Sequence, residues 1–470
     1  MGNLSRRDFL RLSATVATGA VLASCKPAAP APAAPAKPAE KVEEKPKEEK
    51  PAAPAEKVTV RFMSRAGADH LPNYEKCLKE DFEPQYPGIT VSLEPAPDGW
   101  IDKLLTEMIA GTAVDLFQAW GNIFYNWTER GLLLDVQPYV DATMSAEEIA
   151  DYNEFQWTGL VMRGIRVGMP KYINIMTVTI NKDIFDEFGV EYPPENGDWT
   201  HDDYEEMAKS LTKDRTGDGQ IDLWGCWLPA WSWDRFWNHV YMFGGYVVDE
   251  PHGTRCTLGD PSDQAGLEWM YDMIWRKNYF ARPAQVENQW FMNAMTPGFV
   301  AAAESGTYPI TTDMTLREAF RWDMRHVPTG PGRPDGTKKR VVLGTTDAWS
   351  ITKQTKHPDE SWELLHFLSG PVFQKRCVVG SEGIIPVLKS LIEPFIGLVR
   401  DIRPSLKEVR LEVIDEALDW GYPEDTFWFK NQTCAAELIQ PALEKVYTVG
   451  DADPTYFKEI CPKVDACQEE

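Results

Sequence analysis

The chain has 470 residues, with 72 acidic and 48 basic side chains and a formal net charge of −24. Such an excess of negative charge repels nucleic acids and anionic lipid headgroups, so we expect no nucleic-acid partner. The part of the chain after residue 57 is long enough for two or three sizeable cores, and it holds no apolar run of about 18 residues that would predict a membrane-spanning helix.

The start of the chain reads as an export signal. Residues 5–11, S-R-R-D-F-L-R, resemble the twin-arginine signal, and an apolar stretch too short to span a membrane follows them. Residues 22–25, L-A-S-C, resemble a lipobox. We therefore interpret residues 1–24 as a removable signal peptide and Cys25 as a lipid-bearing first residue. A plain signal peptide with a chance arginine pair is the alternative.

The next segment predicts a tether. Residues 26–57 consist almost only of Ala, Pro, Lys and Glu, which cannot bury apolar surface and favour an extended, solvated chain. Together with Cys25, residues 25–57 would hold a folded domain near the outer face of the cytoplasmic membrane, in the periplasm or at the cell surface. A featureless linker is the alternative.

The first folded segments predict a parallel sheet. Residues 58–63 alternate apolar and polar side chains, residues 71–85 have a helical pattern, and residues 89–93 alternate again. A strand, a helix and a second strand at this spacing indicate a βαβ unit. A helix at 101–110 and a buried strand at 114–117 follow.

Later segments are more helical. Apolar stripes over residues 267–275 and 435–446 predict helices packed on a core, and residues 341–343 and 349–351 read as strands. The sequence therefore predicts an α/β fold.

Seven cysteines remain beside Cys25, and an odd number cannot all pair within one molecule. An exported protein can form disulfides, and Cys461 and Cys467 are close in sequence, so we predict that they pair. We expect free, buried thiols at the others, which are Cys77, Cys226, Cys256, Cys377 and Cys434.

Several segments, in one order along the chain, resemble motifs of the extracellular solute-binding proteins of ABC importers. They are A-V-D-L-F-Q-A-W at 113–120, G-L-L-L-D-V at 131–136, V-G-M-P-K-Y at 167–172, T-I-N-K-D-I-F at 179–185, and S-I-T-K with the K-H-P and the helical stretch that follow it, at 350–369. The chain departs from the family pattern at Val114, where a proline is usual, and at Ile180, where a tyrosine is frequent. The carbohydrate-binding branch, with the maltose-binding proteins, is the most similar.

This resemblance implies a two-lobe clamp that closes on its ligand by hinge motion, with hinge crossings near 169–172, 305–308 and 370–373. We assign residues 58–169 and 309–372 to lobe 1, and residues 170–308 and 373–470 to lobe 2. The implied function is a monomeric receptor, not an enzyme, that binds a sugar or oligosaccharide and delivers it to the membrane subunits of an ABC permease.

A run of tryptophans supports a sugar ligand, because the apolar C–H face of a sugar ring stacks on indole. Residues 224–237 contain five tryptophans. The resemblance places Trp231 and Trp233 at the ligand cleft, and we expect Trp224, Trp227 and Trp237 in the core.

Further ligand-binding candidates lie next to expected strands and hinges. Trp120 and Asn122 follow a buried strand, where open α/β sheets bind ligands. The others are Tyr172 and Tyr308 at hinge crossings, Asp347 and Trp349 beside an expected strand, and Trp428 in a segment that resembles an aromatic box of maltose-type proteins. Core packing or a solvated surface is the alternative for each.

Residues 214–222, D-R-T-G-D-G-Q-I-D, follow an EF-hand-like pattern. Its ligands would be Asp214, Thr216, Asp218, Gln220 and Asp222. Gly225 stands where a bidentate glutamate belongs, so a tight Asp-Gly turn without metal is the alternative. We expect calcium there, if any, as a structural ion, and we expect no required cofactor.

Catalytic motifs are missing from the sequence: it has no G-x-S-x-G, H-E-x-x-H, Walker A or G-x-G-x-x-G segment. Two alternatives stay open, an exported polysaccharide-active hydrolase or lyase, and the same clamp with a solute other than a sugar.

Overall fold

The computed structural model describes residues 57–232, 235–250, 252–289, 291–311, 319–342, 347–420 and 429–469. The predicted signal peptide, Cys25, nearly all of the tether, Trp233 and Trp428 lie outside these residues.

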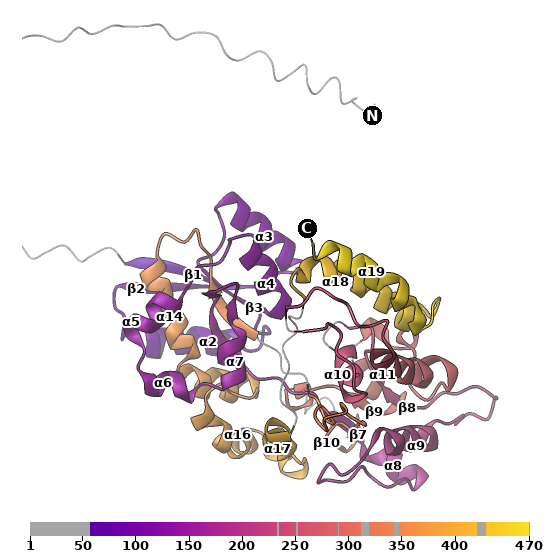
Figure 1. Ribbon diagram of the computed structural model, residues 1–470. Helices are drawn as coiled ribbons and strands as arrows, with labels where there is room; N and C mark the ends of the chain where they lie inside the picture. The colour runs from indigo at the N-terminus through magenta and orange to yellow at the C-terminus, as the bar shows by residue number, and fades with distance from the viewer. Residues whose placement is uncertain are drawn as a thin grey trace, which may run out of the picture. The chain divides into compact units, whose positions relative to one another are not determined.

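A five-stranded sheet forms the centre of lobe 1 (Figure 1). Its order is β2 (Ile89–Pro95), β1 (Val58–Ser64), β3 (Leu116–Trp120), β11 (Asp347–Ile351) and β6 (Met169–Tyr172). Strand β1 is parallel to β2 and β3, whereas β11 is antiparallel to β3 and β6. The βαβ unit expected at the start of the folded chain is therefore confirmed.

A four-stranded sheet forms the centre of lobe 2. Its order is β10 (Trp322–Arg325), β7 (Val178–Asn181), β9 (Val300–Glu304) and β8 (Trp224–Trp227). A separate two-stranded hairpin joins β4 (Val161–Met162) to β5 (Ile165–Arg166). Its two turn residues, Arg163 and Gly164, have φ values of 52° and 81°, which suit the tight turn of a hairpin.

Helices surround both sheets, so the predicted α/β class is confirmed (Figure 1). Those before residue 212 are α2 (Leu71–Cys77), α3 (Trp100–Ala110), α4 (Gly121–Glu129), α5 (Gln137–Thr143), α6 (Ala146–Asp151), α7 (Glu154–Gly159), α8 (Lys182–Phe188) and α9 (His201–Leu211). The later ones are α10 (Phe236–Met242), α11 (Pro261–Tyr271), α12 (Phe291–Met295), α14 (Pro358–Ser369), α15 (Pro371–Phe373), α16 (Lys389–Ile402), α17 (Val413–Trp420), α18 (Gln432–Leu443) and α19 (Phe457–Cys467).

Local sequence explains where these helices begin and end. Thr200 starts α9 with a capping box in which its side chain accepts from the Asp203 amide, while the Asp203 carboxylate accepts from the Thr200 amide. Asn181 caps α8 with its side-chain oxygen, which accepts from the amides of Asp183 and Ile184, and Gly189 ends that helix at a φ of 63°, which glycine adopts without strain.

The passage of the chain between the sheets differs from the predicted boundaries in two places. Residues 170–172, which we assigned to lobe 2, belong to β6 of the first sheet. We assigned residues 309–372 to lobe 1, but β10 lies within this range and pairs with β7 of lobe 2. The chain returns to the first sheet at β11, so it changes sheets after Arg325 and not at 305–308. Residues 341 and 342 belong to no strand, contrary to the expected strand at 341–343, whose last residue is not described.

The predicted disulfide is wrong. Cys461 and Cys467 both lie on α19, where six residues place their side chains on different faces and about 9 Å apart along the axis. Instead Cys256 pairs with Cys461 and Cys434 with Cys467, with Cα–Cα distances of 5.1 and 6.3 Å. The remaining three described cysteines, Cys77, Cys226 and Cys377, are free and buried as expected.

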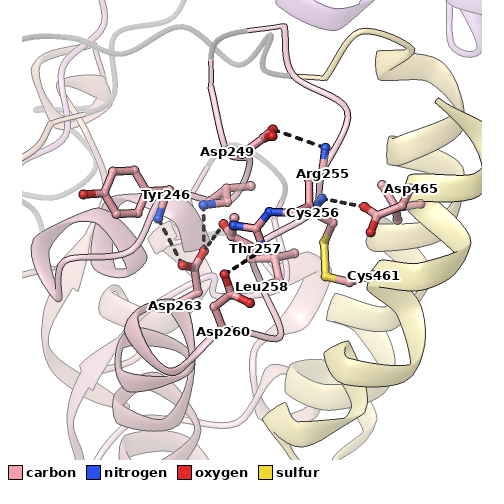
Figure 2. Close-up of a disulfide and its surroundings, with 12 residues drawn as sticks. Tyr246, Asp249, Arg255, Cys256, Thr257, Leu258, Asp260, Asp263, Cys461 and Asp465 are labelled. Atoms are coloured by element: carbon pink, nitrogen blue, oxygen red, sulfur yellow. Dashed lines mark hydrogen bonds and ion pairs between the residues drawn. A yellow bond between two sulfur atoms is a disulfide. The ribbon is translucent and has the colours of Figure 1, made fainter. Parts of the chain in front are cut away.

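Figure 2 shows how the first disulfide holds a loop of lobe 2 against α19. The Cys256 amide donates to Asp465 Oδ1 at 2.6 Å. At the other end, the buried carboxylate of Asp263, in the first turn of α11, accepts from the amides of Tyr246 (3.1 Å) and Val247 (2.6 Å) and from the Thr257 hydroxyl. This loop is therefore fixed at both ends.

Within the described part of the chain, no helix combines the length and the apolar character needed to cross a membrane.

Candidate functional site

Strands β1, β3 and β6 have their C-terminal ends at one edge of the first sheet, and β11 begins at the same edge. Strand β11 runs antiparallel to β3 and β6, and its register places Asp347 opposite both Trp120 and Tyr172. Arg65 directly follows the parallel strand β1 at the same edge. The topology thus brings together Trp120, Tyr172 and Asp347, three residues that the sequence had marked as candidates.

Asp347 is the centre of this edge. Its Oδ2 accepts from Arg65 Nη1 at 2.8 Å and from the Tyr172 hydroxyl at 3.0 Å. Its Oδ1 accepts from Gln118 Nε2 at 2.9 Å. The Asp347 side chain is only 2% exposed, whereas the Arg65 side chain is 26% exposed. A buried carboxylate therefore fixes a partly exposed guanidinium in place.

Two indole rings lie beside that guanidinium. The Arg65 guanidinium carbon lies 4.0 Å from the centre of the Trp120 ring and 5.7 Å from that of Trp100. The two rings meet edge to face, with centroids 5.7 Å apart, and both are half-buried. The edge thus combines flat apolar faces with hydrogen-bond donors held in a fixed direction, which suits a ligand with an apolar face and a polar rim.

Sequence reasoning missed Arg65, Gln118 and Trp100 at this edge. The signal for Arg65 was present, because it follows a strand of a parallel sheet just as Trp120 does. Trp100 opens helix α3 and reaches the edge only through the packing of that helix.

A buried ion pair lies next to the site, at the end of β6. Lys171, the residue before Tyr172, lies with its Nζ 3.1 Å from Glu382 Oε2, and the side chains are 1% and 6% exposed. The Tyr74 hydroxyl donates to the other Glu382 oxygen. Gln374 Nε2 also donates to the Lys171 carbonyl at 2.8 Å, so the end of β6 is held at side chain and backbone.

The sequence from residue 67 to residue 375 matches the family model of the bacterial extracellular solute-binding proteins. The chain belongs to this family. A Brucella abortus (strain 2308) protein whose name describes it as a binding protein is 25% identical over 323 residues, which cover 68% of this chain and 73% of that protein.

Solved structures share the two-lobe fold of this solute-binding protein. An ABC substrate-binding protein of Listeria monocytogenes, in complex with cycloalternan, has a TM-score of 0.72 at 21% identity and covers 88% of this chain and 98% of its own. A Thermotoga lettingae solute-binding protein with α-D-tagatose has a TM-score of 0.69 at 18% identity, covering 88% and 100%. A maltose-bound protein of T. maritima has 0.67 at 18%, covering 88% and 99%. The predicted family and fold are thereby confirmed.

The other predicted ligand-binding residues are placed differently. Trp349 is fully buried and meets Phe373 edge to face, with ring centroids 5.7 Å apart, so its ring is part of the packed interior. Trp231 is 8% exposed in lobe 2, and its carbonyl accepts from Gln440 Nε2 at 3.0 Å. Asn122 lies in α4 and Tyr308 in a short helical turn, and their side chains are not described. Trp224, Trp227 and Trp237 are buried as expected.

In the predicted calcium loop of the solute-binding protein, two carboxylates accept hydrogen bonds from backbone amides of the same loop. Asp214 accepts from the amides of Gly217 and Gly219 at 2.6 and 2.7 Å, and Asp222 accepts from those of Arg215 and Thr216 at 2.7 and 3.0 Å. These bonds depress the pKa of Asp214. Among described residues, no group of three or more His, Cys, Asp or Glu could hold a metal ion. This geometry is that of a tight turn, and calcium at Asp214, Thr216, Asp218, Gln220 and Asp222 stays a prediction.

A buried histidine pair lies at the end of β9 in lobe 2. His201 Nε2 lies 3.0 Å from His239 Nδ1, and His239 Nε2 lies 3.2 Å from Glu304 Oε2. Burial, with a smaller contribution from His239, holds the pKa of His201 well below its usual value. The folded protein therefore keeps His201 neutral.

We expect His201 to make the protein sensitive to mild acid. A depressed pKa means that the unfolded chain binds the proton first, so stability is full above about pH 6.5 and falls as the pH drops toward the lowered pKa, by at most ~1.4 kcal/mol per pH unit. The His201→Gln variant will lose less stability than wild type between pH 7.5 and pH 5.5, as measured by urea unfolding. An exposed control, His252→Asn, will keep the wild-type slope. Equal slopes for all three proteins would contradict the expectation.

Proposed function

We propose that this solute-binding protein captures a sugar or oligosaccharide at the edge formed by Arg65, Trp120 and Asp347. Its two lobes then close on the ligand and deliver it, chemically unchanged, to the membrane subunits of an ABC permease. The observation that carries the proposal is the guanidinium of Arg65, fixed by Asp347 and lying 4.0 Å from the Trp120 ring.

Sugar chemistry fits this arrangement. A pyranose ring has an apolar C–H face that packs on indole and a rim of hydroxyl groups that accept from a guanidinium. The similar structures from Listeria, T. lettingae and T. maritima carry cycloalternan, tagatose and maltose, which supports the same ligand class here.

We further propose that the protein is exported and anchored through lipid on Cys25, and that it acts as a monomer. The S-R-R-D-F-L-R segment and the L-A-S-C segment support the export and the lipid anchor. Replacing Cys25 with serine should move the protein from the membrane fraction to the soluble fraction of the host, while membrane retention of the variant would overturn the lipid anchor.

A thermal-shift screen against a panel of mono- and oligosaccharides tests the ligand class. A bound sugar raises the melting temperature by mass action, and the mixture is then separated by chromatography to see whether the sugar is unchanged. We expect a shift with at least one sugar and no product. Product formation would instead indicate the polysaccharide-active enzyme, and no shift with any sugar would point to another solute.

A matched pair of variants then locates the site. Trp120→Ala should raise the Kd by about 30-fold or more, since a tryptophan at the centre of a binding site commonly contributes about 2 kcal/mol or more. Trp157 is also half-buried, and the Arg166 guanidinium lies 3.8 Å from its ring centre. Arg166 comes just before the start of β6, whereas the proposed site lies at the end of that strand, at Tyr172. Trp157→Ala should therefore leave the Kd unchanged, and an equal loss in both variants would reject the assigned site.

A further inference from the structure

The start of α18, which belongs to lobe 2, touches lobe 1 directly (Figure 1). Helix α18 packs against α19, and Gln440 on α18 donates to the Trp231 carbonyl of lobe 2. Its neighbour across the lobes is α4, which follows β3 and packs on it. The hairpin of β4 and β5 contributes Arg163 to the same contact.

Among the described residues, three donor groups form hydrogen bonds between the lobes there. The Lys430 carbonyl accepts from the Tyr125 hydroxyl and from Arg163 Nη2, both at 2.9 Å. The Thr433 hydroxyl lies 2.5 Å from Asn126 Oδ1 and 3.0 Å from Glu129 Oε2, so it donates to lobe 1 in turn. Glu129 also forms an ion pair with Arg163, whose side chain is 45% exposed. The contact is polar and partly open to water.

The lobe 2 side of this contact is rigidly held. The Lys430 amide donates to the Gly253 carbonyl at 2.9 Å, in the loop that the Cys256–Cys461 disulfide fixes (Figure 2). The Asn431 amide donates to Gln468 Oε1 at 2.6 Å. Cys434, the residue after Thr433, is bonded to Cys467 at the end of α19. Two disulfides therefore position a segment whose groups face the other lobe.

We propose that residues 429–434 form a latch that stabilises the closed arrangement of the two lobes, and that the Cys434–Cys467 disulfide sets the position of this latch. The inference deepens the proposed function, because it assumes that ligand leaves when the lobes separate. The latch residues themselves need not touch the ligand: they act by changing how often the lobes part.

The Tyr125→Phe and Thr433→Val double variant tests the latch. Each lost hydrogen bond should weaken closure by about 3- to 10-fold, and the loss should appear in the ligand dissociation rate and not in the association rate. Tyr139→Phe with Thr158→Val is the matched control, because the Tyr139 hydroxyl donates to Asp359 and the Thr158 hydroxyl to Glu154, all within lobe 1. The control should keep the wild-type dissociation rate.

A second measurement needs no ligand. Hydrogen exchange of the purified protein, read by mass spectrometry, should become faster in the segments 121–129 and 429–434 of the double variant, and unchanged in the control. The Cys434→Ser and Cys467→Ser double variant should speed exchange in 429–434 as well, and should raise the ligand dissociation rate. Unchanged exchange in both segments overturns the latch. If wild type binds no sugar, the proposed function fails, and the exchange measurement still decides on the latch.

Discussion

The Glu382→Gln variant will unfold with a free energy about 3–5 kcal/mol below that of wild type, because it leaves the Lys171 ammonium buried without its counter-ion. The two side chains are 1% and 6% exposed, so water cannot replace the lost carboxylate. The Tyr74 hydroxyl loses a charged acceptor in the same substitution. Urea unfolding at neutral pH measures the difference.

Two further variants test whether the loss of stability arises because the ion pair is buried. Glu80 pairs with Arg376 at the surface, where the side chains are 51% and 33% exposed, so Glu80→Gln should cost less than about 1 kcal/mol. Adding Lys171→Met to Glu382→Gln should restore much of the lost stability, because it removes the unpaired charge. A similar loss for Glu80→Gln and Glu382→Gln would show that the Lys171 site is open to water.

The second large effect concerns ligand binding. Asp347→Asn should raise the Kd for the sugar found by screening by at least about 30-fold, which corresponds to roughly 2 kcal/mol. The carboxylate accepts from three side chains, and an amide offers one oxygen and places an NH₂ group against a donor. Arg65 would then lose the partner that fixes its direction. Calorimetric titration measures the Kd, and urea unfolding measures the accompanying loss of stability.

Asp323 offers a matched control in lobe 2. It forms a buried ion pair with Arg325 at 2.6 Å, and the side chains are 7% and 2% exposed. Both residues lie on β10 of the second sheet, whereas Asp347 lies on β11 of the first sheet. Asp323→Asn should lower stability in a comparable way but leave the Kd unchanged. If both variants bind as wild type does, Asp347 does not position the ligand-binding group.

The pattern of single segments was enough to predict much of the fold. The alternation in residues 58–63 and the helical stripes at 101–110 and 435–446 correspond to β1, α3 and α18. Each of these is a local property, because a strand or helix with one buried face must repeat its apolar side chains at a fixed spacing. The order of the family motifs then indicated the two-lobe fold, and the rule that ligands bind at strand ends marked Trp120.

Tertiary structure decided what depends on residues far apart in the chain. Arg65 and Asp347 are 282 positions apart, and Lys171 and Glu382 are 211 apart, so no local pattern links either pair. The cysteines show the same limit, because proximity in sequence favoured Cys461 with Cys467, and the helix that holds both points them to different partners. Likewise Trp349 and Trp120 look alike in sequence, but only packing buries one ring completely and leaves the other half-exposed. The sequence by itself determined many of the elements and the family, whereas the pairing of distant side chains, which sets the site and the latch, depended on how those elements pack.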